Sequence, residues 1–325
     1  MRTITLEEHF ATPAFLQGPG KFAREAGKAL GNPELANQLL DLGDRRIADM
    51  DSAGIDVQVV SLTAPGVEQE ARAEAASLAR EANDLVAEAI RRHPTRLAGF
   101  SAIPTPDPEA AAGELERSIR ELGFKGAVIN GHVRGRYLDD LSFSPILERA
   151  EALGVPIYLH PTPPPRPVFE TYYAGFAPEV SARFSTAGWG WHIETAAHVL
   201  RMILGGVFDR YPKLQVIIGH LGESLPSMLP RLDRTMSPAL TKLNRPLAAY
   251  LRENLHYTFS GFNFVPSFLD LLLEVGVDRI MFSADYPYAS MDESRQFLDR
   301  LPVPPADRER IAHGNAERLL GLGSP

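Results

Sequence analysis

Residues 125–160 read KGAVINGHVRGRYLDDLSFSPILERAEALGVPIYLH, and they hold one complete unit of the pattern that runs along the chain. Two short runs, 125–130 and 155–160, are nearly continuous in apolar residues, as is typical of strands that are covered on both faces. Between them, residues 144–153 repeat apolar positions at helical spacing. A strand, a helix and a second strand in this order predict a parallel βαβ unit.

The same alternation extends in both directions from this unit. Six further strand-like runs occur at 3–8, 57–62, 97–103, 214–220, 255–260 and 279–285. Helix-periodic segments separate them, at 34–53, 68–93, 107–122, 192–210, 264–275 and 305–320. Eight strands that alternate with helices predict an α/β fold, a (β/α)8 TIM barrel that forms one domain over residues 1–325. The main alternative is a doubly wound open sheet, but no G-x-G-x-x-G follows the first run, which disfavours its dinucleotide-binding version.

Two segments do not fit the alternation. Residues 11–33 are rich in Gly and Pro, and residues 161–190 run from a Pro-rich turn into an aromatic stretch. Long ordered loops are unusual unless they serve a function. We therefore expect both segments to be loop insertions at the C-terminal face of the barrel, where barrel enzymes build their sites.

Composition excludes several classes of protein. The 325 residues include 33 Lys and Arg against 41 Asp and Glu, a formal net charge of −8, and no cysteine. Disulfides, thiol nucleophiles, zinc ribbons and iron–sulfur clusters are thereby excluded. The acidic balance argues against a nucleic-acid partner. Neither a signal peptide nor a membrane span of about 18 apolar residues is recognisable, so we expect a cytoplasmic protein with no membrane partner.

Four of the eight predicted strands end in chemically useful residues. Glu7 and His9 are two positions apart on an extended segment, so their side chains point the same way, toward the barrel lumen. His160 and Asp285 end two other strands. Each residue alone has a structural explanation, as a polar strand end, a core histidine or a turn cap. Because a barrel brings these three strand ends together, two imidazoles and two carboxylates predict a site for one divalent ion such as Zn²⁺, Mn²⁺ or Mg²⁺.

A second pair follows the sixth predicted strand. His220 and Glu223 flank Gly222, and a turn there would let the carboxylate orient the imidazole as a general acid/base dyad. The alternative is a helix N-terminus at which Glu223 interacts with the helix dipole and His220 packs in the core.

Four motifs together resemble a known family: EEHF (7–10), YLHP (158–161), GHLGE (219–223) and SADYP (283–287). They resemble the amidohydrolase superfamily and, within it, the metal-dependent non-oxidative decarboxylases of hydroxybenzoates, such as the γ-resorcylate and 2,3-dihydroxybenzoate decarboxylases. The similarity covers residues 1 to about 320. Glutamate in the first motif, in place of the superfamily's commoner histidine, is shared with these decarboxylases.

The resemblance implies an activity and a role for each residue. One metal ion would be bound by Glu7, His9, His160 and Asp285, and would chelate the carboxylate and ortho-hydroxyl of a small aromatic acid. Either Asp285 or His220, the latter oriented by Glu223, would protonate the ring carbon before carbon dioxide leaves. The fourth strand ends in Asn130 and offers no lysine to bridge two metals, so a binuclear hydrolase site is disfavoured.

The resemblance also implies substrate contacts and an assembly. Asn130, Trp189, Trp191, Tyr288 and Phe10 are the predicted substrate-binding residues of this chain. Arg231 corresponds to an arginine that reaches the substrate from a neighbouring subunit, which implies a homodimer or homotetramer.

Two other functions stay open at this stage. One is a metal-dependent hydrolase or hydratase of a lactone or related small molecule, which would use the same barrel and ligands. The other is a barrel that binds an aromatic acid without turnover. The substitution pattern of the ring, the identity of the metal and the physiological direction of the reaction are not decided by the sequence.

Overall fold

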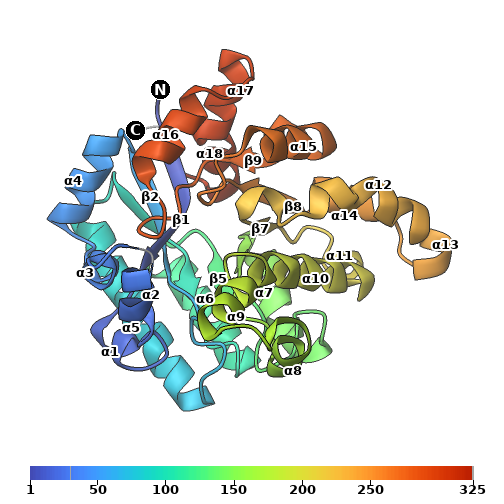
Figure 1. Ribbon diagram of the computed structural model, residues 1–325, viewed down its shortest axis with the longest axis horizontal. Helices are drawn as coiled ribbons and strands as arrows, with labels where there is room; N and C mark the ends of the chain where they lie inside the picture. Colours follow the sequence, from blue (N-terminus) through green and yellow to red (C-terminus); the bar gives the residue numbers. More distant parts are fainter. Residues whose placement is uncertain (30, 324–325) are drawn as a thin grey trace.

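The strands form one parallel ring in chain order. The computed structural model describes residues 1–29 and 31–323 (Figure 1). The strands are β1 (Ile4–Phe10), β2 (Val57–Leu62), β3 (Leu97–Gly99), β4 (Ser101–Ala102), β5 (Ala127–Asn130), β6 (Ile157–His160), β7 (Val216–Ile218), β8 (Leu255–Thr258) and β9 (Ile280–Met281). Pairing runs in the order β1-β2-β3 and β4-β5-β6-β7-β8-β9, and every pair is parallel.

Two junctions connect these sheets into a barrel. At the first, β3 and β4 are one predicted strand interrupted at Phe100, whose N–H donates to the carbonyl of Val60 across 2.9 Å. At the second, the N–H of Leu6 in β1 donates to the carbonyl of Phe282, directly after β9, across 3.2 Å. The predicted TIM barrel is therefore confirmed, with its eight strand positions in the predicted order.

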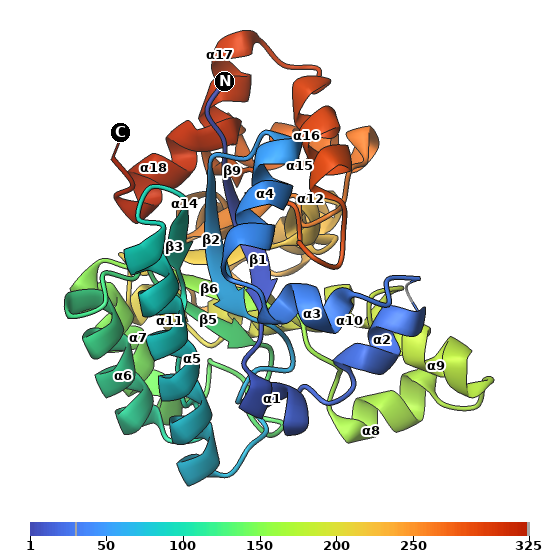
Figure 2. The same ribbon diagram turned by 90° about the vertical axis from the view of Figure 1, so that its left-hand side faces the viewer.

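Helices surround the ring, as Figures 1 and 2 show. The main ones are α4 (Asp44–Ala53), α5 (Arg72–Arg92), α6 (Pro108–Arg120), α7 (Ser144–Leu153), α10 (Gly190–Leu204), α12 (Leu225–Thr235), α14 (Leu247–Glu253), α15 (Val265–Val275), α16 (Met291–Asp299) and α18 (Asn315–Leu320). The helix predicted at 144–153 has those bounds. Asp107 caps α6 by accepting from the N–H of Ala110, and Pro108 takes the first turn, where its missing N–H has no cost.

Some predicted helices are divided. The segment 34–53 forms α3 (Leu35–Leu40) and α4, separated at Gly43, whose N–H donates to the Asp41 carboxylate. The segment 192–210 ends α10 at Leu204, and Gly206 in the left-handed region (φ 69°) starts α11 (Val207–Arg210). Helices α12, α14 and α16 were not predicted. In α12, Pro226 and Pro230 obscure the helical pattern, although a proline in the first turn is compatible with a helix.

The two insertions contain short helices and lie beyond the C-terminal ends of the strands (Figure 2). Residues 11–33 include α1 (Pro13–Gln17) and α2 (Ala23–Ala29). Residues 161–190 include α8 (Arg166–Val168), a π-helical turn (Phe169–Tyr173) and α9 (Pro178–Ser185). In the described part of the chain, no helix is long and apolar enough to cross a lipid bilayer.

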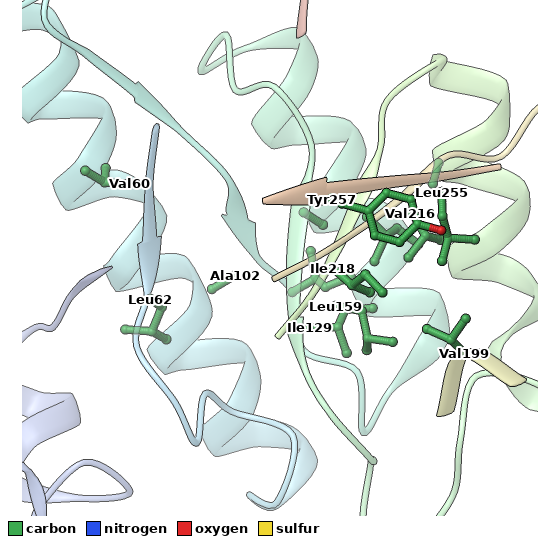
Figure 3. Packing of buried hydrophobic residues seen from close by; sticks show 14 of the residues in the cluster. Val60, Leu62, Ala102, Ile129, Leu159, Val199, Val216, Ile218, Leu255 and Tyr257 are labelled. Carbon is green, nitrogen blue, oxygen red and sulfur yellow. The ribbon is translucent and has the colours of Figure 1, made fainter. Parts of the chain in front are cut away.

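Strand residues alternate between two apolar layers. Ile129, Leu159 and Ile218 belong to the larger cluster, which fills the space between strands and helices (Figure 3). Val128 and Tyr158 belong to a smaller cluster that fills the barrel interior. Side chains of a strand alternate sides, so the residues two positions after these interior ones also face inward. Asn130 and His160 are those residues, which places them at the interior mouth of the barrel.

Candidate metal centre and acid/base dyad

A β-bulge in β1 turns Glu7 into the barrel. Ile4 and Leu6 lie in the interior cluster, so regular alternation would send Glu7 outward. The register with β2 shifts between Leu6 and Glu8, and Glu7 has a φ of 67°. The extra residue reorients the following side chains, as bulges near active sites do. As a result Glu7 and His9 share the interior side, as predicted, while Glu8 faces the backbone after β9, with its Oε1 accepting from the N–H of Ala284 at 2.9 Å.

The four predicted ligands meet at the mouth of the barrel. His160 Nε2 lies 3.3 Å from Glu7 Oε1, and His9 Nε2 lies 3.1 Å from Asp285 Oδ1. The rings of His9 and His160 pack edge to face, with centroids 4.8 Å apart. Ligand atoms of Glu7, His9 and His160 all lie within 4.8 Å of one another. Four residues separated by up to 278 positions in the chain thus form one cluster.

The cluster has the properties expected of a divalent metal site. Glu7 and His9 are each only 1% exposed. Glu7 Oε1 and both ring nitrogens of His9 form no hydrogen bond with any described residue; the close contacts of Glu7 Oε1 and His9 Nε2 are to other members of the cluster. Buried polar atoms without partners are rare, and each one calls for an explanation such as a bound ion. Two imidazoles and two carboxylates are ligands that zinc and manganese accept, so the residues fit one such ion.

Three hydroxyl groups hold the other oxygen of Glu7. Tyr158 and Ser260 each donate to Glu7 Oε2, and the Thr258 hydroxyl lies 3.4 Å from it. These neighbours fix the carboxylate so that Oε1 points to the histidines, as the outer partners of metal ligands do. They were not predicted from the sequence. Thr258 ends β8 and Ser260 follows it by two residues, while Tyr158 precedes His160 by two residues on β6. This spacing of two is the pattern that would have found them.

The charges in the cluster are strongly coupled. Burial raises the pKa of Glu7, but His220, His160 and His9 outweigh it, so the pKa of Glu7 is lowered. Burial, reinforced by the charge of Glu7, raises the pKa of Asp285 well above its usual value. The two carboxylates therefore differ when no ion is bound: Glu7 stays ionised, and Asp285, whose side chain is 18% exposed, favours its protonated form. A pair of carboxylates with opposite protonation is a common basis for acid catalysis.

His220 and Glu223 form a hydrogen-bonded pair beside the cluster. His220 Nδ1 lies 2.8 Å from Glu223 Oε1, and His220 Nε2 lies 3.9 Å from Glu7 Oε1. Burial lowers the pKa of His220, but Glu223 and Glu7 outweigh it and raise the pKa to about 10. This geometry matches the predicted dyad, and the ring of His220 points its second nitrogen at the metal cluster.

A third residue of this group, His192, was missed. It lies in the first turn of α10, and its Nδ1 is 2.6 Å from Glu223 Oε2. The sequence offers no signal for it, because His192 follows an insertion and matches none of the four motifs.

Of the predicted substrate-binding residues, Asn130 and Tyr288 lie next to residues of the metal cluster. Asn130 is buried and pairs in register with His160. The ring of Tyr288 packs edge to face on His9, with centroids 5.4 Å apart, and its hydroxyl is 2.7 Å from that of Thr63.

The other four predicted residues lie elsewhere. Phe10 is buried in the larger apolar cluster, Trp189 is 48% exposed, Trp191 is half-buried, and Arg231 is exposed on α12. Within residues 1–29 and 31–323, no side-chain hydrogen bond or ring contact joins these last four to the metal cluster.

A buried carboxyl group, Glu68, supports Asn130. Glu68 Oε1 accepts from the backbone N–H of Asn130 at 2.9 Å, while Glu68 Oε2 has no partner among the described residues. Burial raises the pKa of Glu68 from its usual 4.5 to about 8, although the Asn130 hydrogen bond opposes the shift. Glu68 therefore carries a proton in the folded protein at pH values where the unfolded chain has released it.

This difference predicts a pH-dependent stability. Because the pKa of Glu68 is higher in the folded state, its contribution to the free energy of unfolding falls as the pH rises from about 4.5 to about 8. Glu68→Gln keeps the oxygen that accepts from Asn130 and removes the ionisation. We expect the free energy of unfolding of Glu68→Gln to match that of the wild type near pH 4.5 and to exceed it by roughly 1–3 kcal/mol near pH 8. Denaturant unfolding at both pH values measures this difference. An equal difference at the two pH values would contradict an ionising Glu68.

The barrel, the cluster of candidate metal ligands at its C-terminal mouth and the adjacent His220–Glu223 pair are the features of a metal-dependent enzyme of the amidohydrolase type. The amidohydrolase family model matches residues 39–322, and the chain belongs to this family. The resemblance drawn from the motifs is thereby confirmed.

Several of the similar proteins are decarboxylases. A γ-resorcylate decarboxylase from a Polaromonas species is 39% identical over 98% of this chain and 98% of its own. The crystal structure of a dihydroxybenzoic acid decarboxylase from a Polaromonas species, with bound manganese and the inhibitor 2-nitroresorcinol, superposes with a TM-score of 0.90 at 38% identity, over 100% of this chain and 98% of that one. The 5-carboxyvanillate decarboxylase of Novosphingobium aromaticivorans, in complex with manganese and 4-hydroxy-3-methoxy-5-nitrobenzoic acid, has a TM-score of 0.90 at 33% identity, over 98% and 96% of the two chains.

Proposed function

We propose that this protein is a non-oxidative decarboxylase of an ortho-hydroxylated aromatic carboxylic acid that uses one divalent metal ion. The observation that carries the proposal is the cluster of Glu7, His9, His160 and Asp285 in a chain 39% identical to a γ-resorcylate decarboxylase. Buried ligand atoms of Glu7 and His9 form no hydrogen bond with any described residue. Manganese is the first ion to test, because it is bound in the similar structures.

The four residues of the cluster are the proposed metal ligands. When bound, the ion would hold the substrate's carboxylate and ortho-hydroxyl oxygens and favour the phenolate. Tyr158 and Ser260 would keep Glu7 turned toward it, since both donate to the other oxygen of that carboxylate. Asn130 and Tyr288 are the proposed substrate contacts nearest the cluster, and Phe10, Trp189 and Trp191 are weaker candidates for the walls of the ring slot.

Asp285 is the proposed proton donor. Its Oδ1 lies 3.1 Å from His9 Nε2, and in the metal-free chain partial burial and the negative charge of Glu7 raise the pKa of this carboxyl group. It would transfer its proton to the ring carbon that bears the carboxylate. The electron pair of the carbon–carbon bond then returns to the ring as carbon dioxide leaves, which restores aromaticity. His220, held by Glu223, is the alternative donor, and its Nε2 faces the same space.

A substrate panel tests this function. Purified protein reconstituted with Mn²⁺ is incubated with salicylate, 2,3- and 2,6-dihydroxybenzoate, 5-carboxyvanillate and a hydroxynaphthoate. We expect at least one acid to release one equivalent of carbon dioxide and the matching phenol. Phenolic acids that lack the ortho-hydroxyl group serve as the control and should not react, because they cannot chelate. Hydrolysis of lactones without gas release would support the hydrolase alternative instead.

We also propose that the chain forms a homodimer or homotetramer in which Arg231 reaches the substrate of a neighbouring subunit. Arg231 is exposed on α12, which extends from the barrel beside α15 (Figure 1). Large apolar side chains are exposed on or next to these two helices: Met228, Phe264, Val265, Leu269 and Leu273. Contiguous exposed apolar groups often mark protein interfaces.

This assembly predicts a specific effect of Arg231→Ala. Light scattering should give a multiple of the 35.7 kDa chain mass for both wild type and variant. The variant should have KM raised about 10-fold or more, because a charged contact to the substrate carboxylate is lost. Arg234→Ala, three residues further on the same exposed helix, is the control and should leave KM unchanged. A monomer, or an unchanged KM in Arg231→Ala, would contradict the proposal.

A further inference from the structure

His192 contacts the His220–Glu223 dyad from a distant element, the first turn of α10. Its Nδ1 contacts Glu223 Oε2 at 2.6 Å, while His220 Nδ1 contacts Glu223 Oε1 at 2.8 Å. The Glu223 carboxylate is thus held by an imidazole at each oxygen, and its side chain is fully buried. A carboxylate held at both oxygens cannot rotate without breaking a charge-assisted hydrogen bond.

The other nitrogen of His192 also faces an acceptor. His192 Nε2 lies 3.1 Å from the carbonyl oxygen of Ala187, near the end of the 161–190 insertion. The Ala187 carbonyl and the ionised Glu223 carboxylate can only accept hydrogen bonds. Each of the two contacts is therefore a hydrogen bond when the ring nitrogen of His192 that makes it carries a hydrogen. In that form His192 links the insertion to the turn that carries the dyad. Phe262 packs edge to face on both imidazoles, with centroids 4.9 Å from His192 and 5.2 Å from His220, and shields the group from water.

The turn that carries the dyad needs such a restraint. His220, Leu221, Glu223 and Ser224 all have positive φ, between 49° and 66°. Non-glycine residues hold this conformation only where the surroundings impose it, and they cluster at functional sites. The bond from His192 to Glu223 is a direct restraint on this turn from outside it.

We propose that His192 is a positioning residue that fixes Glu223, and through it the ring of His220, in the orientation required for proton transfer. This inference rests on the proposed function in that His220 acts on the substrate. His192 itself would touch neither substrate nor metal, because its two ring nitrogens contact Glu223 and the carbonyl oxygen of Ala187.

Three variants test the inference. His192→Leu removes the donor to Glu223 at similar bulk. His192→Asn places an amide N–H near the position of Nδ1 and retains the donor. His198→Gln changes another buried histidine of α10, whose Nε2 accepts from the N–H of Leu138, and serves as the control. Metal content and thermal unfolding are measured for each, so that a variant that does not fold is recognised before kinetics are compared.

We expect His192→Leu to lower kcat about 10–100-fold with KM changed less than about 3-fold, as for other residues that orient a functional histidine. His192→Asn should recover kcat to within about 5-fold of wild type, and His198→Gln should match wild type. Wild-type kcat in His192→Leu, or equal losses in His192→Leu and His192→Asn, would overturn the inference, because it assigns the effect to one donor.

A second measurement does not depend on turnover. Proton NMR of the metal-free protein with ¹⁵N-labelled histidine detects imidazole N–H groups bonded to a carboxylate. We expect two such signals in the wild type, loss of one and displacement of the other in His192→Leu, and an undisturbed His220 signal in His192→Asn. An undisturbed His220 signal in His192→Leu would overturn the inference. If the wild type releases no carbon dioxide from any acid tested, the proposed function fails, and the NMR result still decides the role of His192.

Discussion

Asp285→Asn should reduce decarboxylation by about 10²–10⁴-fold or more, because an amide cannot donate the proton that the ring carbon needs. Asparagine keeps the size of the side chain and one oxygen next to His9 Nε2, 3.1 Å away in the wild type. The measurement is kcat with the preferred acid, together with the manganese content of each preparation, since a loss of rate with retained metal separates proton donation from metal binding.

The control for this variant is Asp292→Asn, an exposed aspartate at the start of α16, which should keep the wild-type rate. A wild-type rate in Asp285→Asn would remove Asp285 from the chemistry. The proton would then come from His220, and the same loss of rate would be found in His220→Ala at unchanged metal content.

Glu7→Gln should lose the metal and the activity together. Glu7 is buried, and its charge is stabilised by His220, His160 and His9, so it is the most strongly ionised ligand of the cluster. Glutamine has the same shape without the negative charge. Changes in residues that only orient a ligand weaken metal affinity 10–100-fold, so replacing the ligand itself should weaken it by about 100-fold or more. Titration of metal-free protein with Mn²⁺ measures this affinity directly.

Glu8→Gln is the matched control, one residue away on the same strand. Because of the bulge, Glu8 faces the backbone amides of Ala284 and Tyr286 and not the ligands. We expect Glu8→Gln to bind manganese with an affinity within about 3-fold of wild type. Equal losses in both variants would mean that the strand, and not the Glu7 carboxylate, determines the affinity.

The barrel and the convergence of the four candidate ligands could be predicted because they follow from chain-wide regularities. Apolar runs that alternate with helices define parallel strands, and the C-terminal ends of such strands converge whatever the loops do. His160 and Asp285 were placed beside Glu7 and His9 on that ground, and the structure brings all four together. The family was recognised from motifs at the same strand ends, and the family match confirms it.

Other features depend on contacts that leave no local pattern. Regular alternation from Leu6 would have sent Glu7 to the outside of the barrel, and only the bulge with positive φ turns it inward. His192 reaches Glu223 across 31 positions, through the angle at which α10 leaves the insertion. The roles of Phe10, Trp189, Trp191 and Arg231 stay predictions, because they depend on the bound substrate and on a neighbouring subunit.

The most direct test of the account is elemental analysis of the purified protein paired with chelation. We predict one divalent ion per chain, loss of all decarboxylase activity when a chelator removes it, and recovery when one equivalent of Mn²⁺ is restored. Full activity in a preparation free of divalent ions would contradict the account, as would a second ion bound at His192, His220 and Glu223.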